Sequence, residues 1–330
     1  MKIALLVLPG ARSFDVVAAM EVLADDREDR GVPRNDVVVC SPQPVVELEH
    51  GMTLRSDAGT EAVVGADLVV VPGFAGVSSV LRDTPADATY TQAVRALEAA
   101  SAGGSAVAAL CTGAFLVAAA GLFDGASATT HWRHCAALQT ARPAVRVEHN
   151  VLFTHDPDRR VWSSAGVAAG IDLCLAIVAD EHGAAAAATI ARSMVLPAAR
   201  PGGQAQFVPP RFREREVPDA GLAALTACVQ ADLARSWSLA EMADVAFVST
   251  RTLQRLFRSS FACAPSQWLV EARVTAAREL LEATTLSVAE VARRVGLSTD
   301  DGLRKHFHRL LGVSPSTYRS AFGRSGILEA

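Results

Sequence analysis

The carboxyl-terminal part of the chain repeats one short pattern: Ser238-Leu-Ala-Glu-Met-Ala243 and, 49 residues later, Ser287-Val-Ala-Glu-Val-Ala292. Ser-x-x-Glu is a capping box, in which the serine hydroxyl and the glutamate carboxylate accept hydrogen bonds from free amides at a helix start. Ser249 and Ser298 follow the two copies and are predicted to cap a second helix in each. At an offset of 50, Leu253, Phe257, Pro265 and Trp268 then match Leu303, Phe307, Pro315 and Tyr318. Each copy is therefore predicted to form a short helix, a turn and a second helix.

The second helix of each copy has an apolar side and a side of hydrogen-bond donors. Leu253 and Phe257, four residues apart, are predicted to be buried, and the second copy has an equivalent pair. The candidate DNA-binding residues on the opposite sides are Ser249, Thr250, Arg251, Gln254, Arg255, Arg258, Ser298, Thr299, Arg304, Lys305 and His308. Arginine can read guanine, and glutamine adenine, through paired hydrogen bonds in the major groove. A single basic helix face is commonly only a solvated surface, but two copies with the same caps and buried pairs favour DNA binding.

The two second helices differ in charge. Asp300 and Asp301 lie in the first turn of the second copy, where they suit the helix dipole but repel phosphate. That helix is therefore predicted to position the duplex more than it reads bases, while Arg251 and Arg255 carry most of the base readout.

The chain has 330 residues, about twice the length of a typical domain. Residues 1–221 hold 18 Lys and Arg against 25 Asp and Glu, a net of −7, whereas residues 222–330 hold 13 against 10, a net of +3. Between them, residues 197–219 contain five prolines and two glycines without apolar periodicity. The predicted division is a first domain over 1–196, a linker over 197–221 and an all-α domain over 222–330.

The first part alternates short apolar runs with helical runs. Predicted strands are 3–8, 36–40, 68–71, 106–110 and 161–164, and predicted helices are 15–25, 90–101, 114–120 and 168–182. Continuous apolar strands that alternate with helices predict a parallel sheet covered on both faces. Ligands of such sheets bind at the carboxyl ends of the strands.

Ala109-Leu-Cys-Thr-Gly-Ala114 places Cys111 between a predicted strand and a predicted helix. This is the setting of a nucleophile elbow, where the helix dipole favours the thiolate. A small, buried and inert cysteine is the alternative. The elbow setting favours a solvent-facing thiol, without indicating turnover.

The remaining composition argues against metal, disulfide and membrane. The six cysteines have no C-x-x-C pair, so neither a zinc site nor a disulfide is expected. Residues 99–123 carry no charge, but Gly103-Gly104 and the Cys-Thr-Gly turn at 111–113 interrupt them, as expected of strand, elbow and helix. A cytoplasmic protein is predicted.

Residues 239–322 resemble the AraC/XylS-type DNA-binding domain, including its closing segment Gly312-Val-Ser-Pro-Ser-Thr-Tyr-Arg319. The resemblance implies two helix-turn-helix units joined by a long helix, over about 266–283, that reach successive major grooves about 34 Å apart. Phe247 departs from the pattern, since the second copy has Gly296 in the corresponding turn.

Residues 3–197 resemble the DJ-1/PfpI superfamily, which has a flavodoxin-like, class I glutamine amidotransferase-like α/β fold. Cys111 falls at the family's elbow cysteine, His131 at its associated histidine, and Asp15 where many members have an acidic residue. Asp15, Cys111 and Thr112 also resemble isonitrile hydratase, a catalytic branch. The ligand pocket implied by the resemblance is Asp15, Cys111, Thr112 and His131; Ala19 departs from the Gly or Pro that commonly follows the acid.

The order of the two domains, together with the run Ser164–Asp172, resembles the GlxA branch of transcriptional regulators. The resemblance implies a sequence-specific regulator of transcription whose partners are double-stranded DNA, RNA polymerase and a second copy of the chain. The first domain would dimerise or bind a small-molecule effector, with no cofactor and no catalysis. A Cys111-dependent hydratase or amidase fused to a DNA-binding module is the alternative, and a purely structural scaffold leaves the duplicated basic helices without a use.

Overall fold

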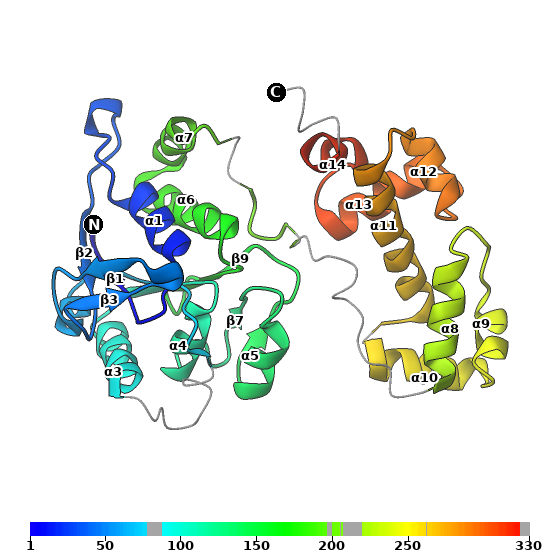
Figure 1. Cartoon of the computed structure of the whole chain (residues 1–330), viewed down its shortest axis with the longest axis horizontal. Coiled ribbons are helices and arrows are strands. Elements are labelled where there is room, and N and C mark those ends of the chain that lie inside the picture. The colour runs from blue at the N-terminus through cyan, green and yellow to red at the C-terminus, as the bar shows by residue number, and fades with distance from the viewer. Residues whose placement is uncertain (78–87, 197–199, 205, 207–219, 262, 324–330) are drawn as a thin grey trace. The chain divides into compact units, whose positions relative to one another are not determined.

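The computed structural model describes residues 1–77, 88–196, 200–204, 206, 220–261 and 263–323. The chain divides into two compact units, Met1–Gln206 and Phe207–Ala330 (Figure 1). Each unit has its own hydrophobic core. Among the described residues, no helix is long and apolar enough to cross a membrane.

A six-stranded sheet forms the centre of the first unit. Its strands are β1 (Lys2–Leu6), β2 (Asp36–Cys40), β5 (Leu68–Val71), β6 (Ala106–Leu110), β9 (Phe153–Asp156) and β10 (Val161–Ser164), in the spatial order β2-β1-β5-β6-β10-β9. The first five in this order pair in parallel, and β9 is antiparallel to β10 at the edge. The predicted α/β fold is confirmed, with one antiparallel edge strand added.

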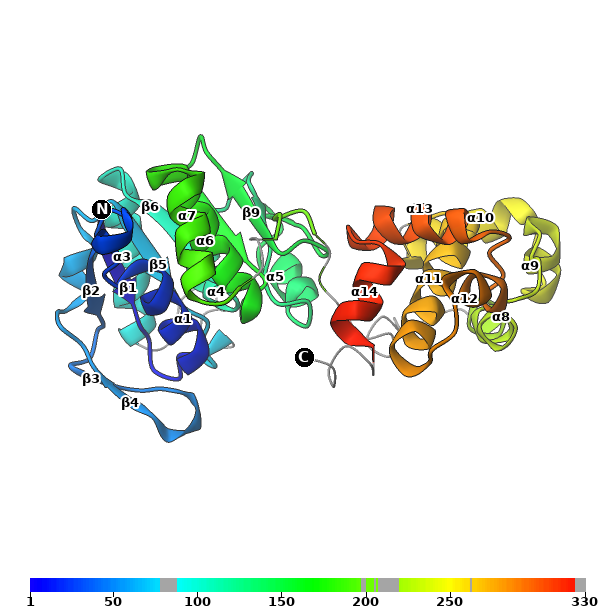
Figure 2. The ribbon, with the colours of Figure 1, turned by 90° about the horizontal axis from the view of Figure 1, so that it is seen from above.

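Helices cover both faces of this sheet (Figures 1 and 2). They are α1 (Ser13–Leu23), α3 (Ala88–Ala102), α4 (Gly113–Ala119), α5 (Cys135–Ala141), α6 (Ala168–His182) and α7 (Ala184–Ser193). Ile3 and Leu5 share a core with α1, α6 and α7, whereas Ala4 and Leu6 share a core with α3, α4 and α5. Because successive strand residues point to opposite faces, β1 contributes to both cores.

Several short elements were not indicated by sequence patterns. They are β3 (Val45–Glu47), β4 (Thr53–Arg55), β7 (Ser127–Ala128), β8 (Arg146–Val147), the edge strand β9 and the helices α5 and α7. Two or three residues are too few to show a strand period, and the alanine run of α7 has few large apolar residues that would mark a helix face.

The first unit continues past residue 196, where the sequence predicted the linker to begin. The Arg200 guanidinium pairs with the buried Asp172 carboxylate, with Nη2 2.6 Å from Oδ2. Gln206 is only 4% exposed and bonds to the first unit. The compact unit therefore includes residues that the sequence assigned to the linker, because Arg200 binds to α6 and Gln206 binds to loops of the first unit.

The second unit consists of helices. They are α8 (Ala220–Ala231), α9 (Leu239–Val245), α10 (Thr250–Phe261), α11 (Pro265–Ala283), α12 (Val288–Arg294), α13 (Asp300–Leu311) and α14 (Pro315–Phe322). Leu225, Met242 and Phe257 form one core with the start of α11, and Leu303 and Phe307 are buried in the second half of the unit. The predicted pair of helix-turn-helix units joined by a long helix is confirmed. Figure 2 shows α10 and α13 along the same side of this unit.

Candidate DNA interface and ligand pocket

The second helix of the first helix-turn-helix unit, α10, exposes the predicted donors. Ser249 caps it, since its hydroxyl accepts a hydrogen bond from the Thr252 amide at 3.2 Å. The exposed residues include the predicted Ser249, Thr250, Arg251, Gln254, Arg255 and Arg258, while Leu253 and Phe257 are fully buried as predicted. Among the described residues, no carboxylate lies within ion-pair distance of these three arginines, so their guanidinium groups are available to a ligand.

The corresponding helix of the second helix-turn-helix unit, α13, begins one residue later than the sequence suggested. The hydroxyl that accepts from the Gly302 amide, at 3.0 Å, belongs to Thr299 and not to the predicted Ser298. The insertion that changes the repeat offset from 49 to 50 lies before this cap, so Thr299 is the counterpart of Ser249. Ser298 and Thr299 are both exposed.

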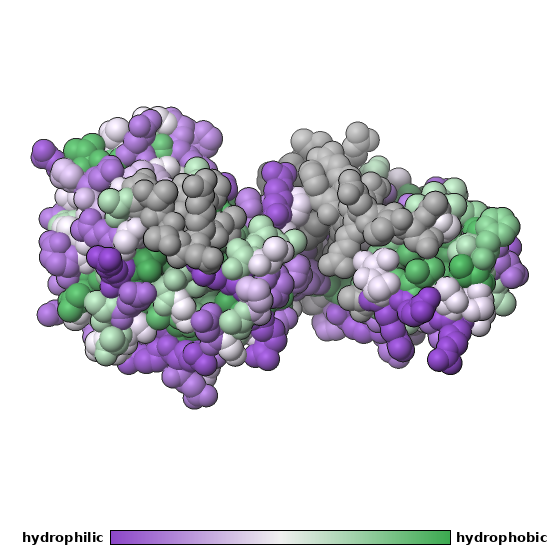
Figure 3. All heavy atoms as spheres, turned by 90° about the horizontal axis from the view of Figure 1, so that it is seen from below, coloured by the Kyte–Doolittle hydropathy of each residue, from purple (hydrophilic) through white to green (hydrophobic). Residues whose placement is uncertain are grey.

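Charge distinguishes α13 from α10. Arg304 pairs with Asp300 at 3.1 Å and with Asp301 at 3.4 Å, both within its own helix. Lys305 and His308 are exposed. The Arg304 guanidinium is therefore already paired with carboxylates of its own helix. Figure 3 shows hydrophilic residues along one edge of the second unit.

The turns of the two helix-turn-helix units have the same backbone geometry. Phe247 has φ 55° and Gly296 has φ 78°, both in the left-handed region. The Phe247 side chain is 94% exposed, so it fills no space in the core. A Cβ on Gly296 would lie 2.3 Å from the carbonyl oxygen of Leu233. The glycine is required by close packing in the second turn, whereas the first turn is open.

Arg273, near the middle of α11, was not indicated by the sequence. Its Nε donates to the Leu233 carbonyl at 3.1 Å and its Nη2 to the Arg235 carbonyl at 2.7 Å. The Nη2 also lies 2.8 Å from the position of a Cβ on Gly296. Arg273 therefore bonds to the chain that follows α8 and lies against the turn of the second helix-turn-helix unit. It helps to fix the orientation of the two helix-turn-helix units.

The closing segment of the AraC-type resemblance docks α14 on α11. Gly312, at φ 73°, ends α13, and the Ser314 hydroxyl caps α14. Tyr318 packs against Phe307 with ring centroids 5.3 Å apart, and its hydroxyl accepts from the Arg278 Nε at 3.1 Å. Arg278 is 4% exposed. This segment thus completes the core around Leu303 and Phe307 in the second half of the unit.

The elbow of the first unit has the predicted backbone but a buried thiol. Cys111 follows β6 with φ 51°, the strained left-handed geometry of a strand-to-helix elbow. Its exposed fraction is 0%, because β10 and the chain after it lie directly against it. A Cβ on Gly166 would lie only 2.1 Å from the Cys111 Cβ. The expectation of a solvent-facing thiol is therefore wrong.

Burial also reverses the expected acidity of this thiol. Desolvation, followed by the charge of Asp15, raises the pKa of Cys111 to about 12, and Arg12 lowers it only partly. The helix dipole was expected to favour the thiolate, but α4 has only seven residues and the thiol has lost its water. The protonated thiol is the stable form near neutral pH.

Asp15 and Thr112 are fixed around the elbow by backbone contacts. The Asp15 carboxylate accepts from the amides of Gly73 and Val167, each at 3.1 Å. Burial raises the pKa of Asp15 against the effect of these two bonds. The Thr112 hydroxyl both accepts from the Phe74 amide at 2.8 Å and donates to its carbonyl at 2.9 Å. Both side chains therefore hold the chain after β5 over the cysteine.

His131 lies in the loop after β7 and has no hydrogen bond to the Cys111 thiol among the described residues. Its Nδ1 accepts from the Arg133 amide at 3.4 Å, and its ring lies 6.1 Å from the ring of His134. Burial, followed by the charges of His134 and Arg12, lowers the pKa of His131 to about 4. The imidazole is therefore neutral at physiological pH.

Comparison with known proteins identifies the family. A helix-turn-helix domain model matches residues 242–321, and the DJ-1/PfpI family model matches residues 1–180. The HTH-type transcriptional regulator GbdR of Pseudomonas aeruginosa is 32% identical over 284 residues, covering 83% of this chain and 71% of that protein. The regulator CdhR of the same organism is 31% identical over 317 residues, covering 96% and 90%. The chain belongs to the AraC-type transcriptional regulators with an amino-terminal DJ-1/PfpI domain. Its second unit is the DNA-binding domain of this family.

The fold of the regulator's first unit is also found in a solved structure. The AraC family transcriptional regulator from Pseudomonas putida has a TM-score of 0.50 and 23% identity, covering 58% of this chain and 98% of that chain. At this identity the likeness shows the fold alone.

Arg12 is a charged residue near the elbow of the regulator that sequence patterns did not indicate. Its charge acts on the pKa values of Asp15, Cys111, His131 and His134. Its Nε is buried and has no hydrogen-bond partner among the described residues. Arg12 lies before α1, 99 residues from the cysteine, so no local motif could connect the two.

Gln206 connects the same region to the end of the first unit. Its Nε2 donates to the carbonyls of Thr130 at 3.1 Å and Val151 at 3.0 Å, and its Oε1 accepts from the Trp132 amide at 2.9 Å. The Thr130 hydroxyl in turn donates to the Cys111 carbonyl at 2.7 Å. The last described residue of the first unit is therefore held by the loop that contacts the elbow.

Proposed function

We propose that this regulator recognises a specific operator in double-stranded DNA, with α10 supplying most of the base readout. The supporting observation is the contrast between the exposed Arg251, Arg255 and Arg258, which have no carboxylate partner among the described residues, and Arg304, which is paired within α13. Unpaired guanidinium groups can read guanine without first losing an intrahelical bond.

Residues at the helix starts are suited to the DNA backbone. Ser249, Thr250, Ser298 and Thr299 are exposed at the starts of α10 and α13, and a helix start favours phosphate. Lys305 and His308 add phosphate or base contacts on α13. One chain would cover two successive major grooves, whose centres are about 34 Å apart.

The experiment selects bound DNA from a random pool with the full-length chain and then compares variants on the selected site. Arg251→Ala and Arg255→Ala should each cost about 1–3 kcal/mol on that site and leave binding to random duplex almost unchanged. Arg294→Ala, an exposed arginine of α12, is the matched control. Equal losses on selected and random DNA would mean that the two side chains contact phosphate, which contradicts base readout.

The first unit is proposed to dimerise. Phe14 and Val17 of α1 are 47% and 56% exposed, and their three-residue spacing places them on one side of the helix. An apolar pair on an outer helix suits contact with a second copy of the chain. Val17→Glu should reduce the sedimenting mass and shorten the DNase footprint. An unchanged mass would exclude this surface.

The pocket of Asp15, Cys111, Thr112 and His131 is proposed to sense a small molecule without turning it over. The Cys111 thiol is buried and protonated, and among the described residues it has no hydrogen bond to His131. A nucleophilic cysteine needs such a base beside it. Regulation would then act through RNA polymerase at a chromosomal promoter, which places the protein in the cytoplasm. No cofactor is required for this role.

The alternative, a Cys-dependent hydratase or amidase, is favoured only by the elbow and by the likeness of Asp15, Cys111 and Thr112 to isonitrile hydratase. Incubation with isonitriles and simple amides tests it. Multiple turnovers that disappear in Cys111→Ser would establish an enzyme, and their absence supports the sensor. In the absence of effector, DNA affinity of Cys111→Ser should stay within about 1 kcal/mol of the parent.

A further inference from the structure

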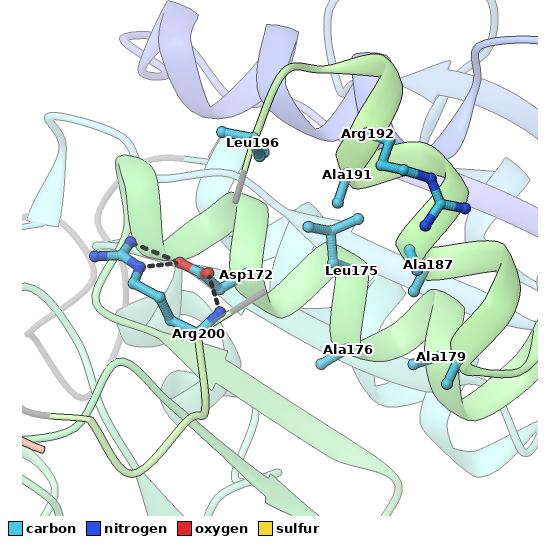
Figure 4. A pocket seen from close by; sticks show the side chains of 11 residues that line it. Asp172, Leu175, Ala176, Ala179, Ala187, Ala191, Arg192, Leu196 and Arg200 are labelled. Atoms are coloured by element: carbon cyan, nitrogen blue, oxygen red, sulfur yellow. Dashed lines mark hydrogen bonds and ion pairs between the residues drawn. The ribbon is translucent and has the colours of Figure 1, made fainter. Parts of the chain in front are cut away.

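A hollow of about 390 Å³ lies between α6 and α7 of the first unit (Figure 4). Leu175 and Ala179 of α6 face Ala187 and Ala191 of α7 across it. Alanine side chains are too short to fill the space between the two helices, so the described residues leave a hollow between apolar walls. A concave, mainly apolar site of this size with a few polar groups is the usual form of a small-molecule site.

One side of the hollow carries a cation. Arg192 extends from α7 beside Ala187, is exposed, and bonds through Nη2 to the Thr189 hydroxyl at 3.1 Å. Among the described residues, no carboxylate lies within 4.0 Å of its guanidinium group. A planar guanidinium with unused donors fits a carboxylate, which it binds with two parallel hydrogen bonds.

The opposite end is already neutralised. Asp172, 6% exposed, accepts at Oδ1 from the Arg200 amide at 2.9 Å, and at Oδ2 from the Arg200 Nε at 3.1 Å and Nη2 at 2.6 Å. Figure 4 shows this ion pair at the far end of the hollow from Arg192. Because the charges of Asp172 and Arg200 cancel, Arg192 is the lining charge that a ligand can meet.

We infer that the hollow between α6 and α7 is a second ligand site, separate from the Cys111 pocket, which binds a small aliphatic carboxylate. The hydrocarbon chain lies along the alanines of the two helices, and the carboxylate pairs with Arg192. None of the residues that line the hollow belongs to the proposed sensor pocket. The inference therefore stands or fails independently of the DNA-binding function.

The test uses the full-length protein and octanoate, with octanol as the uncharged probe, and measures binding by titration calorimetry. Octanoate should bind once per chain and more tightly than octanol. Arg192→Gln should weaken octanoate at least tenfold and leave octanol unchanged, while Arg192→Lys restores part of the preference. Ala188→Phe, at an exposed position that lines the hollow, should weaken both probes. Arg30→Gln, an exposed arginine outside the hollow, is the control.

Other outcomes would overturn the assignment. Absence of octanoate binding, or binding that Arg192→Gln and Ala188→Phe leave unchanged, excludes a carboxylate site here. Binding that changes in Cys111→Ser but not in Ala188→Phe places the ligand at the elbow. Self-association that Ala188→Phe abolishes, without octanoate binding, identifies the hollow as a contact between copies of the chain.

Discussion

The two equivalent turns of the DNA-binding unit should respond to substitution with opposite signs. Phe247 has φ 55° and is 94% exposed, so replacing it removes no buried contact. A side chain in the left-handed region costs about 1–2 kcal/mol of strain, which glycine avoids. Glycine itself costs about 0.5–1 kcal/mol, because it loses more conformational freedom on folding. Phe247→Gly should therefore stabilise the second unit by about 0.5–1 kcal/mol, which corresponds to a rise of about 2–8 °C in its Tm.

Gly296 has the same backbone conformation in a closed environment. A Cβ at this position would lie 2.3 Å from the Leu233 carbonyl oxygen and 3.0 Å from that of Ala234. Gly296→Ala adds backbone strain of about 1–2 kcal/mol to overpacking of about 1–3 kcal/mol, so a loss of about 2–5 kcal/mol is expected.

Calorimetry of the full-length chain measures both effects, and the transition of the first unit serves as an internal reference. Phe247→Ala keeps the left-handed strain but removes the ring, so its stability should stay within about 0.5 kcal/mol of the parent. If Phe247→Ala stabilises as much as Phe247→Gly, the gain comes from loss of the exposed ring and the strain argument is wrong. A tolerated Gly296→Ala would refute the packing argument.

Further predictions concern both units. Because burial raises the pKa of Cys111 to about 12, iodoacetamide at pH 7.5 should alkylate it far more slowly than the exposed Cys228, as peptide mapping would show; faster labelling would contradict burial. The pKa of His131 is lowered to about 4, so between about pH 6.5 and 4 the unfolded chain binds a proton that the native state does not. The first unit should lose stability as the pH falls through this range. Over the same pH range, the urea midpoint of His131→Gln should fall less than that of the parent chain. Gln206→Ala leaves buried backbone groups unpaired and should lower the free energy of unfolding of the first unit by about 1–3 kcal/mol, measured by urea unfolding. An unchanged free energy would show that the Gln206 hydrogen bonds do not stabilise the first unit. Arg273→Ala should weaken binding to a two-groove site more than to a half-site in gel-shift titrations, with Arg273→Met as the control for helix stability; equal losses would exclude a positioning role.

Local patterns in the sequence were sufficient for much of the architecture. The capping box at Ser238 forms as predicted, with the serine and Glu241 bonding to each other's amides at 3.1 and 2.8 Å. Leu253 and Phe257 are buried, and the donors between them are exposed. Capping boxes, helical periods and continuous apolar strands are interactions between near neighbours, so the residues themselves specify them.

Tertiary structure alone decided the state of the elbow cysteine. The motif around Cys111 fixed its left-handed backbone, but its burial depends on Gly166, 55 residues later, and its raised pKa depends on lost hydration and on Asp15. The same holds for Phe247 and Gly296, which share a turn geometry but differ in what faces them. Solvent exposure, and with it the pKa of a group or the space for a side chain, is set by segments distant in sequence that pack against it, and no local pattern encodes them.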